Sequence, residues 1–230
     1  MVNNSIYSNF RSLFNIELAK RLLSAIIFVP VFIFCLYKGG VFLFSLFIFF
    51  FIIIFSELVI IFKLSNLKIG VALYILLVTY TLSLSPFYYF SLDNNFFIFI
   101  YLLLSLWIFD TFSYLGGNLF RGKKIFPKLS KGKTYSGSIT GFTGVCLFNL
   151  FLMYYLYSKI YFNLFILALI ICTLSFLGDA IVSFIKRRSD LKDTGSLFIG
   201  HGGFLDRMDS FILVFFFFII FDIHTLILYV

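Results

Sequence analysis

Charged residues are scarce in this sequence. Of its 230 residues only 12% are charged, whereas 62% are hydrophobic. A soluble domain carries about 25% charged and about 45–50% apolar residues. No soluble fold could bury this much apolar surface, but a lipid bilayer could cover it. The composition therefore excludes an ordinary soluble domain and indicates an integral membrane protein.

Cysteine and histidine are also scarce, which limits the metal and redox chemistry open to the chain. Cys35, Cys146 and Cys172 lie inside apolar segments, and none is spaced for a metal or redox site. We interpret them as buried apolar side chains and expect no disulfide framework. His201 has no cysteine near it in the sequence, so a tetrahedral zinc site is not expected.

Long apolar blocks are what the sequence has in abundance. A helix needs about 20 mainly apolar residues to cross a bilayer, and it must satisfy its backbone groups internally. Seven blocks reach or nearly reach this length. We therefore predict an all-α polytopic membrane protein with about seven transmembrane helices and cytoplasmic active-site loops. The predicted spans are 22–37, 40–62, 69–90, 96–117, 138–157, 161–183 and 208–230.

The blocks belong to one membrane domain. No linker rich in proline, glycine or serine divides them, and no internal repeat is evident. Residues 1–106 form an N-terminal transmembrane region with few polar residues, and residues 107–230 form a C-terminal transmembrane region that carries the polar motifs. Glu57 is the one acid within a span of the first half, and it is either functional or paired inside the bundle.

The basic residues are distributed unevenly among the loops. If the N-terminus is cytoplasmic, sixteen of the eighteen lysines and arginines fall in cytoplasmic segments, and only Lys38 and Lys159 fall outside. Cytoplasmic loops of membrane proteins carry such an excess. The net charge of +8 therefore reflects topology, and we expect no nucleic-acid partner. Both polar clusters then face the cytoplasm.

The first polar cluster follows the fourth apolar block. Asp110 ends an apolar run, where it could also serve as a structural partner for nearby lysines. In the segment Ser130-Lys-Gly-Lys133-Thr134, small residues expose backbone N–H groups beside lysine and threonine donors, as in phosphate-binding loops. The segment lacks the spacing of a P-loop, so a basic topology anchor with a flexible glycine remains an alternative.

The second polar cluster, residues 178–210, is denser. It contains five of the ten acids, together with basic residues, closely spaced glycines and His201. A topology anchor requires lysine and arginine but no aspartate. The mixture favours metal-assisted phosphate chemistry, because Mg²⁺ binds carboxylates and phosphates while basic side chains neutralise the remaining phosphate charge. Asp206 and Asp209 are three residues apart and share one face of a helix.

This second cluster resembles the signature of the phosphatidate cytidylyltransferase family. The signature reads Ser, any, apolar, Lys-Arg, four residues, Lys-Asp, any, Gly, a short gap, His-Gly-Gly, apolar, any, Asp-Arg, apolar, Asp. Val182 stands where the family usually has Glu, and Ile199 stands where Pro or Gly is usual. Every fixed polar position is matched, namely Ser183, Lys186, Arg187, Lys192, Asp193, Gly195, His201, Gly202, Gly203, Asp206, Arg207 and Asp209.

The upstream cluster is similar to the same family. There the family has an Asp, a Tyr and a Gly before a lysine-rich loop that ends in Ser-Pro-x-Lys-Thr, and Lys131 here replaces the proline. The matching positions are Asp110, Tyr114, Gly116, Ser130, Lys133, Thr134, Tyr135 and Gly137.

The resemblance implies the transfer of a cytidylyl group from CTP to phosphatidate, which gives CDP-diacylglycerol and pyrophosphate, with Mg²⁺ and room for a second cation. It implies an enzyme of the bacterial cytoplasmic membrane whose active site faces the cytoplasm, in contact with membrane lipid, and it leaves a homodimer open. Metal ligands would be Asp179, Asp206 and Asp209; catalytic residues would be Lys192, Asp193, His201 and Arg207; substrate-binding residues would be Asp110, Ser130, Lys133, Thr134, Ser183, Lys186, Arg187, Gly202 and Gly203.

Two other functions stay open as alternatives. Another CTP-dependent membrane lipid enzyme, such as a polyprenol kinase, would share the phosphate chemistry, although the signature disfavours it. A transporter would place polar residues through the bilayer midplane of several spans. The first three spans are instead nearly all apolar, and the polar clusters lie at one face.

Overall fold

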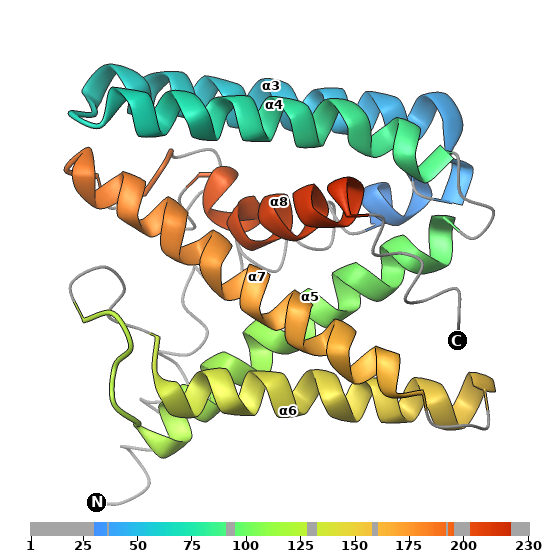
Figure 1. The fold of residues 1–230 in the computed structure, drawn as a ribbon. Helices are drawn as coiled ribbons and strands as arrows, with labels where there is room; N and C mark the ends of the chain where they lie inside the picture. Colours follow the sequence, from blue (N-terminus) through green and yellow to red (C-terminus); the bar gives the residue numbers. More distant parts are fainter. Residues whose placement is uncertain are drawn as a thin grey trace, which may run out of the picture.

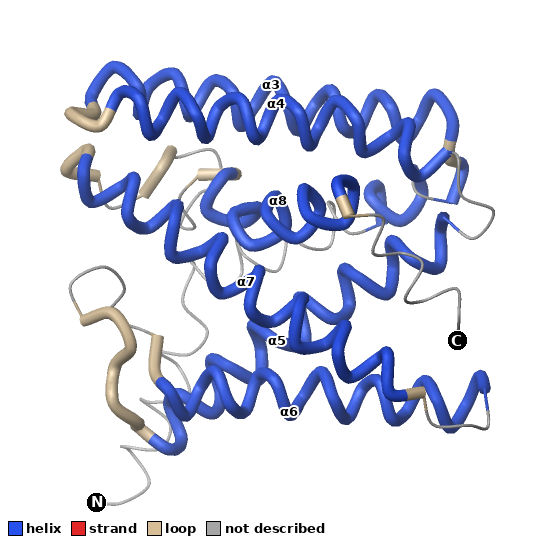
Figure 2. The backbone as a smooth tube through the Cα atoms, viewed as in Figure 1, coloured by secondary structure: helices blue, strands red, loops and turns tan. Residues whose placement is uncertain are grey.

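A computed structural model of the protein describes residues 30–35, 37–90, 95–127, 133–157, 161–191, 193–195 and 203–221. These residues are almost entirely helical and contain no β-strand beyond one isolated bridge between Lys124 and Thr134 (Figure 2). The predicted all-α class is therefore confirmed. The helices are α3 (Gly40–Leu64), α4 (Lys68–Phe90), α5 (Asn95–Phe120), α6 (Tyr135–Leu152), α7 (Phe162–Arg188) and α8 (Leu205–Ile220), and a π-helix, Met153–Tyr157, continues α6.

The helices form layers. In Figure 1, α3 and α4 lie side by side as one layer, α6 lies on the opposite side, and α5 and α7 run diagonally between them. Helix α8 packs against both α4 and α7. Successive helices alternate in direction, so one end of the molecule gathers the ends of α3, α5 and α7 and the beginnings of α4, α6 and α8 (Figure 1). We call this the polar end, and it includes the loop residues 65–67, 121–127, 133–134, 189–191, 193–195 and 203–204.

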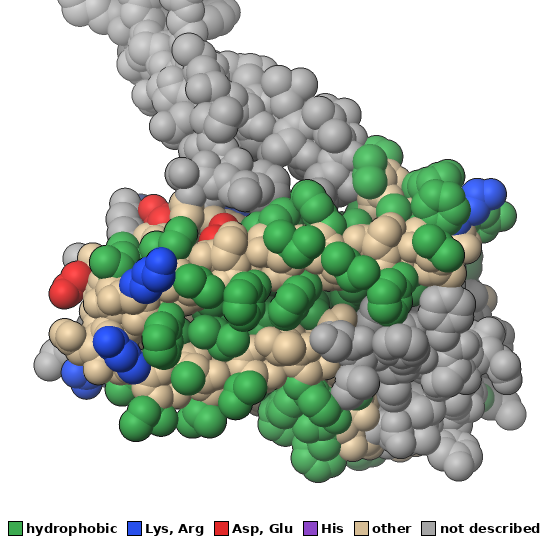
Figure 3. Space-filling view, turned by 90° about the horizontal axis from the view of Figure 1, so that it is seen from above, with side chains coloured by type: hydrophobic (Ala, Val, Ile, Leu, Met, Phe, Trp, Pro, Cys, Tyr) green, Lys and Arg blue, Asp and Glu red, His purple; other side chains and the backbone are tan. Residues whose placement is uncertain are grey.

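The outer surface of the helices is apolar. Four helical stretches are long and apolar enough to cross a membrane, namely Gly40–Leu64, Phe99–Phe120, Tyr135–Tyr155 and Phe162–Arg188, and a shorter apolar helix covers Lys68–Leu82. Val41 and Ile69 are more than three-quarters exposed, at 83% and 80%. Figure 3 shows hydrophobic side chains along one face, with charged side chains gathered mainly toward one end. Side chains of this kind require lipid around them, so the protein is an integral membrane protein.

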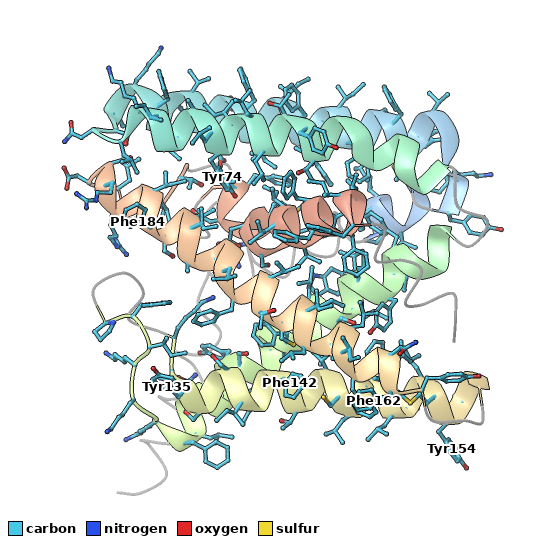
Figure 4. All side chains as sticks on the ribbon, in the orientation of Figure 1. Tyr74, Tyr135, Phe142, Tyr154, Phe162 and Phe184 are labelled. Carbon is cyan, nitrogen blue, oxygen red and sulfur yellow. The ribbon has the colours of Figure 1, made fainter. Side chains whose placement is uncertain are left out.

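Aromatic residues mark both ends of the helical stretch formed by α6 and the π-helix. Tyr135 begins α6 and Tyr154 lies in the π-helix at the opposite end (Figure 4), and both are well exposed. Tyrosine is enriched at the two membrane–water interfaces because its ring is apolar and its hydroxyl is polar. The 21 residues of Tyr135–Tyr155 span about 30 Å at the rise of an α-helix, which matches the hydrocarbon core of a bilayer.

The helix boundaries agree with the predicted spans to within a few residues, except at the C-terminal ends of α7 and α8. Helix α8 ends at Ile220, whereas the predicted span ran to residue 230. Helix α7 continues to Arg188, whereas the predicted span ended at residue 183. Lysine and arginine are good helix formers and are favourable at a helix C-terminus, so the basic run adds another turn. The span predicted at 22–37 is described only from residue 30 onward, and residues 222–230 of the last span lie outside the described residues.

Glycines allow the helices to cross closely. A Cβ atom on Gly144 of α6 would lie 2.7 Å from Cγ of Phe112 on α5, and one on Gly178 of α7 would lie 2.5 Å from the carbonyl oxygen of Asp209 on α8. In a membrane, lipid is as apolar as the helices, so the hydrophobic effect does not drive them together. Small residues help them associate because they let the backbones pack closely. The crossing at Gly178 places the adjacent Asp179 beside the first turns of α8.

Candidate active site

Two lysine–aspartate ion pairs lie at the polar end. Lys133, just before α6, pairs with Asp179 of α7. Lys186 of α7 pairs with Asp206 of α8 at 2.6 Å between Nζ and Oδ1. The second pair is the more shielded, because its side chains are only 13% and 10% exposed. The structure thus brings together residues that are 46 and 20 positions apart in the sequence.

Helix α7 supplies one face of the site. Asp179, Ser183 and Lys186 are spaced by four and three residues, so they share a face of the helix. Arg187 points elsewhere: it is exposed, and its guanidinium donates to the Leu191 carbonyl at 3.3 Å. Val182, where the family usually has Glu, is 1% exposed and belongs to the apolar core. The valine that replaces the usual glutamate at this position is therefore compatible with its apolar surroundings.

The carboxylate of Asp206, in the first turn of α8, accepts three hydrogen bonds. Oδ1 of Asp206 accepts from Lys186, and Oδ2 accepts from the backbone N–H groups of Thr194 at 2.9 Å and Gly203 at 3.1 Å. Burial alone would raise the pKa of Asp206, but the lysine ammonium and the two N–H groups outweigh it and hold the pKa below its ordinary value. Asp206 is therefore ionised at neutral pH and fixed in orientation.

Lys133 is a shielded cation with several acidic neighbours. Its ammonium lies 5.0 Å from the centre of the Phe176 ring, next to its partner Asp179. Burial lowers the pKa of Lys133 to about 8, against the opposing attraction of Asp209 and Asp110. Asp209 is half-buried and Asp110 is exposed. Lys133 is thus mostly protonated at neutral pH.

The segment around Lys133 is held by backbone contacts. The N–H of Ile125 donates to the Lys133 carbonyl, and the N–H of Tyr135 donates to the Lys123 carbonyl, both at 3.0 Å. Thr134 is buried and caps α6, because its hydroxyl accepts from the Gly137 N–H at 3.1 Å. A contact between Thr134 and substrate stays a prediction.

The remaining predicted residues divide into two groups. Asp193 and Arg207 are exposed at the polar end, and Gly203 contributes its N–H to Asp206. The others, Ser130, Lys192, His201 and Gly202, lie outside the described residues, as does Ile199.

The acids of the site have the right chemistry for a hard divalent cation. Asp179, Asp206 and Asp209 offer the oxygen ligands that Mg²⁺ prefers, and this ion commonly uses one or two carboxylates plus substrate phosphates. Among the residues that the structure describes, no group of three or more His, Cys, Asp or Glu side chains is arranged to hold a metal ion.

Two buried polar residues near the site were not assigned to it from the sequence. Glu57 of α3 is paired inside the bundle, with Thr194 and the start of α8. Tyr74 of α4 lies near the start of α8 (Figure 4), and its buried hydroxyl has no hydrogen-bond partner in the described part of the chain. Glu57 could be singled out only as an acid within an apolar span, and no spacing pattern marks Tyr74.

Comparison with known proteins identifies related sequences. The sequence pattern of the cytidylyltransferase family matches residues 70–224. A phosphatidate cytidylyltransferase of Rickettsia conorii is 40% identical over 129 residues, which cover 52% of this chain and 55% of the relative. One from Staphylococcus haemolyticus is 35% identical over 118 residues, or 50% of this chain and 45% of the relative. The chain thus spans about half the length of the curated relatives it matches.

Proposed function

We propose, since this chain belongs to the cytidylyltransferase family, that it transfers a cytidylyl group from CTP to phosphatidate and so forms CDP-diacylglycerol and pyrophosphate. The observation that carries the proposal is the convergence of Lys133 and Lys186 with Asp179, Asp206 and Asp209 at one end of the helices. The names of the related enzymes point to the same reaction.

The reaction joins two anions, so charge is its main obstacle. A phosphate oxygen of phosphatidate attacks the α-phosphorus of CTP, the bond from that phosphorus to the bridging oxygen breaks, and pyrophosphate leaves. Such a transfer depends on positioning and charge stabilisation rather than on covalent help from the protein. Lys133 and Lys186 would each exchange an aspartate partner for a phosphate oxygen. Their ammonium groups would then offset the repulsion between the substrates.

We further propose that the acids hold Mg²⁺ when CTP binds. Asp179 and Asp206 are the first candidates as ligands, with Asp209 one turn beyond Asp206. Bound there, the ion would neutralise part of the triphosphate charge and leave the lysines to the other phosphate oxygens. Asp206 is ready for this role because it is ionised and its orientation is fixed by two backbone N–H groups.

The polar end suits one substrate that is a nucleotide and one that is a lipid. We propose that it faces the cytoplasm from a bacterial cytoplasmic membrane, because the described lysines and arginines, apart from Lys38, lie at this end. CTP would arrive from water, and the head group of phosphatidate would arrive laterally from the inner leaflet.

An assay with labelled CTP tests this function. Purified protein is given phosphatidate or a polyprenol, with and without Mg²⁺, and CTP labelled at either the α- or the γ-phosphorus. We expect Mg²⁺-dependent entry of the α-label into lipid with phosphatidate alone, and release of the γ-label in pyrophosphate. Entry of the γ-label into polyprenol would instead identify a kinase. Failure of both labels to reach lipid would reject both enzymes.

A further inference from the structure

Glu57 supplies the cap that helix α8 lacks. The first N–H groups of a helix have no partner within it, and a side chain at the N-cap position usually accepts from them. The N-cap residue Phe204 has no side chain that can do so. The carboxylate of Glu57, from α3, accepts instead from the N–H groups of Phe204 at 2.7 Å and Leu205 at 2.9 Å. A negative charge at this end also complements the helix dipole.

The same carboxylate holds the segment that orients Asp206. Oε2 of Glu57 accepts from the Thr194 hydroxyl at 2.9 Å, while the backbone N–H of Thr194 donates to Asp206. The other N–H that binds Asp206 belongs to Gly203, the neighbour of a residue bound by Glu57. Both donors to Asp206 are therefore fixed by groups that Glu57 holds.

Two glycines make room for this carboxylate. A Cβ atom on Gly203 would lie 2.5 Å from Oε2 of Glu57, and one on Gly195 would lie 2.9 Å from Oε1. Glu57 itself is 4% exposed, so it cannot swing into water to avoid such a contact. Gly195 and Gly203, two glycines of the matched signature, are therefore required sterically by Glu57, a residue outside that signature.

We propose that Glu57 is a positioning residue: it fixes Thr194 and Gly203, and through them the orientation of Asp206. The first half of the chain then contributes directly to the site, although Glu57 lies outside the matched residues 70–224. The expected effect of Glu57 on turnover rests on the proposed function. Its expected effect on how firmly the backbone of residues 193–195 and 203–206 is held does not.

Glu57→Gln is the informative substitution because it keeps the size of the side chain. The amide has one acceptor oxygen instead of two, and its NH₂ group would face a backbone or hydroxyl donor. Thr194→Val removes one of the three hydrogen bonds and provides a second variant if Glu57→Gln does not fold. Asn149→Ala is the matched control, because Asn149 is also buried and makes two hydrogen bonds, with Tyr101 and Leu164, away from the polar end.

Hydrogen–deuterium exchange and kinetics on the full chain together test the proposal. We expect Glu57→Gln to speed exchange in the peptides covering residues 193–195 and 203–206, to lower kcat by about tenfold or more, and to raise the Mg²⁺ concentration for half-maximal activity. Asn149→Ala should lower thermal stability without changing exchange in those peptides or the Mg²⁺ requirement of the folded protein.

The outcomes separate this inference from the proposed function. Unchanged exchange and an unchanged Mg²⁺ requirement in Glu57→Gln would overturn the positioning role, even if the wild-type protein makes CDP-diacylglycerol. The positioning role would also be overturned if Asn149→Ala changed the local exchange and the Mg²⁺ requirement as much as Glu57→Gln does. Loss of stability alone would then explain both changes. Faster local exchange in a protein that never uses CTP would support the positioning role and reject the proposed reaction.

Discussion

At the scale of the residue, the polar end keeps its charges in pairs. Lys133 pairs with Asp179 and Lys186 pairs with Asp206, and the proposed reaction would replace each carboxylate by a phosphate oxygen. Burial strengthens such interactions because water no longer competes for the charges. A lysine that served only as a topology anchor would stay exposed, as Lys124 does.

Lys133→Ala therefore tests the upstream loop. We expect it to raise the KM for CTP or phosphatidate by about tenfold, because a charge-assisted contact to phosphate is lost. Lys133→Arg should recover part of the loss, since the charge stays but the point-like ammonium is replaced. Lys124→Ala, in the same loop, serves as the control and should leave the steady-state kinetics unchanged. If Lys133→Ala behaved like Lys124→Ala, the loop would be a charge anchor.

The sequence predicted most of these residues but not their partners. Aspartates and lysines in an otherwise apolar chain stand out, and their matched spacing indicated phosphate chemistry. The pairing of Lys133 with Asp179 depends on how α6 and α7 pack, which no local pattern contains. The link between Glu57 and Thr194 joins residues 137 positions apart, and nothing in either neighbourhood indicates the other.

At the scale of the element, helix crossings decide where the acids lie. The apolar blocks predicted the helices well because length and hydrophobicity are local properties. They could not predict that α7 and α8 cross at Gly178, because that depends on which faces of the two helices meet. This crossing brings the residue before Asp179 on α7 against the backbone of Asp209 and Ser210 on α8.

Gly178→Ala should therefore weaken both stability and activity. Its Cβ atom would meet backbone atoms, at 2.5 Å from the Asp209 carbonyl oxygen and 2.9 Å from Cα of Ser210, so the helices would have to separate. We expect a destabilisation of about 1–3 kcal/mol, measured by thermal unfolding in detergent, together with a several-fold loss of turnover.

Gly70→Ala is the control for this crossing. Its Cβ atom would meet only the flexible end of the Leu67 side chain, at 2.9 Å. Alanine also favours helix over glycine by about 1 kcal/mol, so this variant should be as stable as the wild type or more so. A Gly178→Ala protein as stable and active as Gly70→Ala would show that the close crossing is not required.

At the scale of the whole molecule, alternating helices separate two ends of different character. The polar end carries the ion pairs and most of the described basic residues, whereas Lys38 lies before α3 at the opposite end (Figure 1). The distribution of lysine and arginine predicted this separation before any packing was known, because it reflects membrane insertion rather than folding.

Cysteine labelling tests the predicted orientation. In intact cells, a membrane-impermeant maleimide should label Lys38→Cys but should label Lys124→Cys only after lysis. Both lysines are exposed, and unsubstituted protein gives the background from the native cysteines. Labelling of Lys124→Cys in intact cells would place the polar end outside and separate it from cytoplasmic CTP.

The central claim is that the polar end carries metal-dependent cytidylyl transfer, and one pair of variants tests it most directly. Asp206→Asn keeps the size of the side chain but removes its charge, whereas Asp190→Asn removes the charge of an exposed aspartate just after α7. Asp190 has a φ of 54°, which asparagine also tolerates. The measurement is turnover of CTP with phosphatidate at saturating Mg²⁺. We predict a loss of about 10²–10³-fold in Asp206→Asn and near-normal turnover in Asp190→Asn. Equal turnover in the two variants would contradict the account and remove Asp206 from the active site.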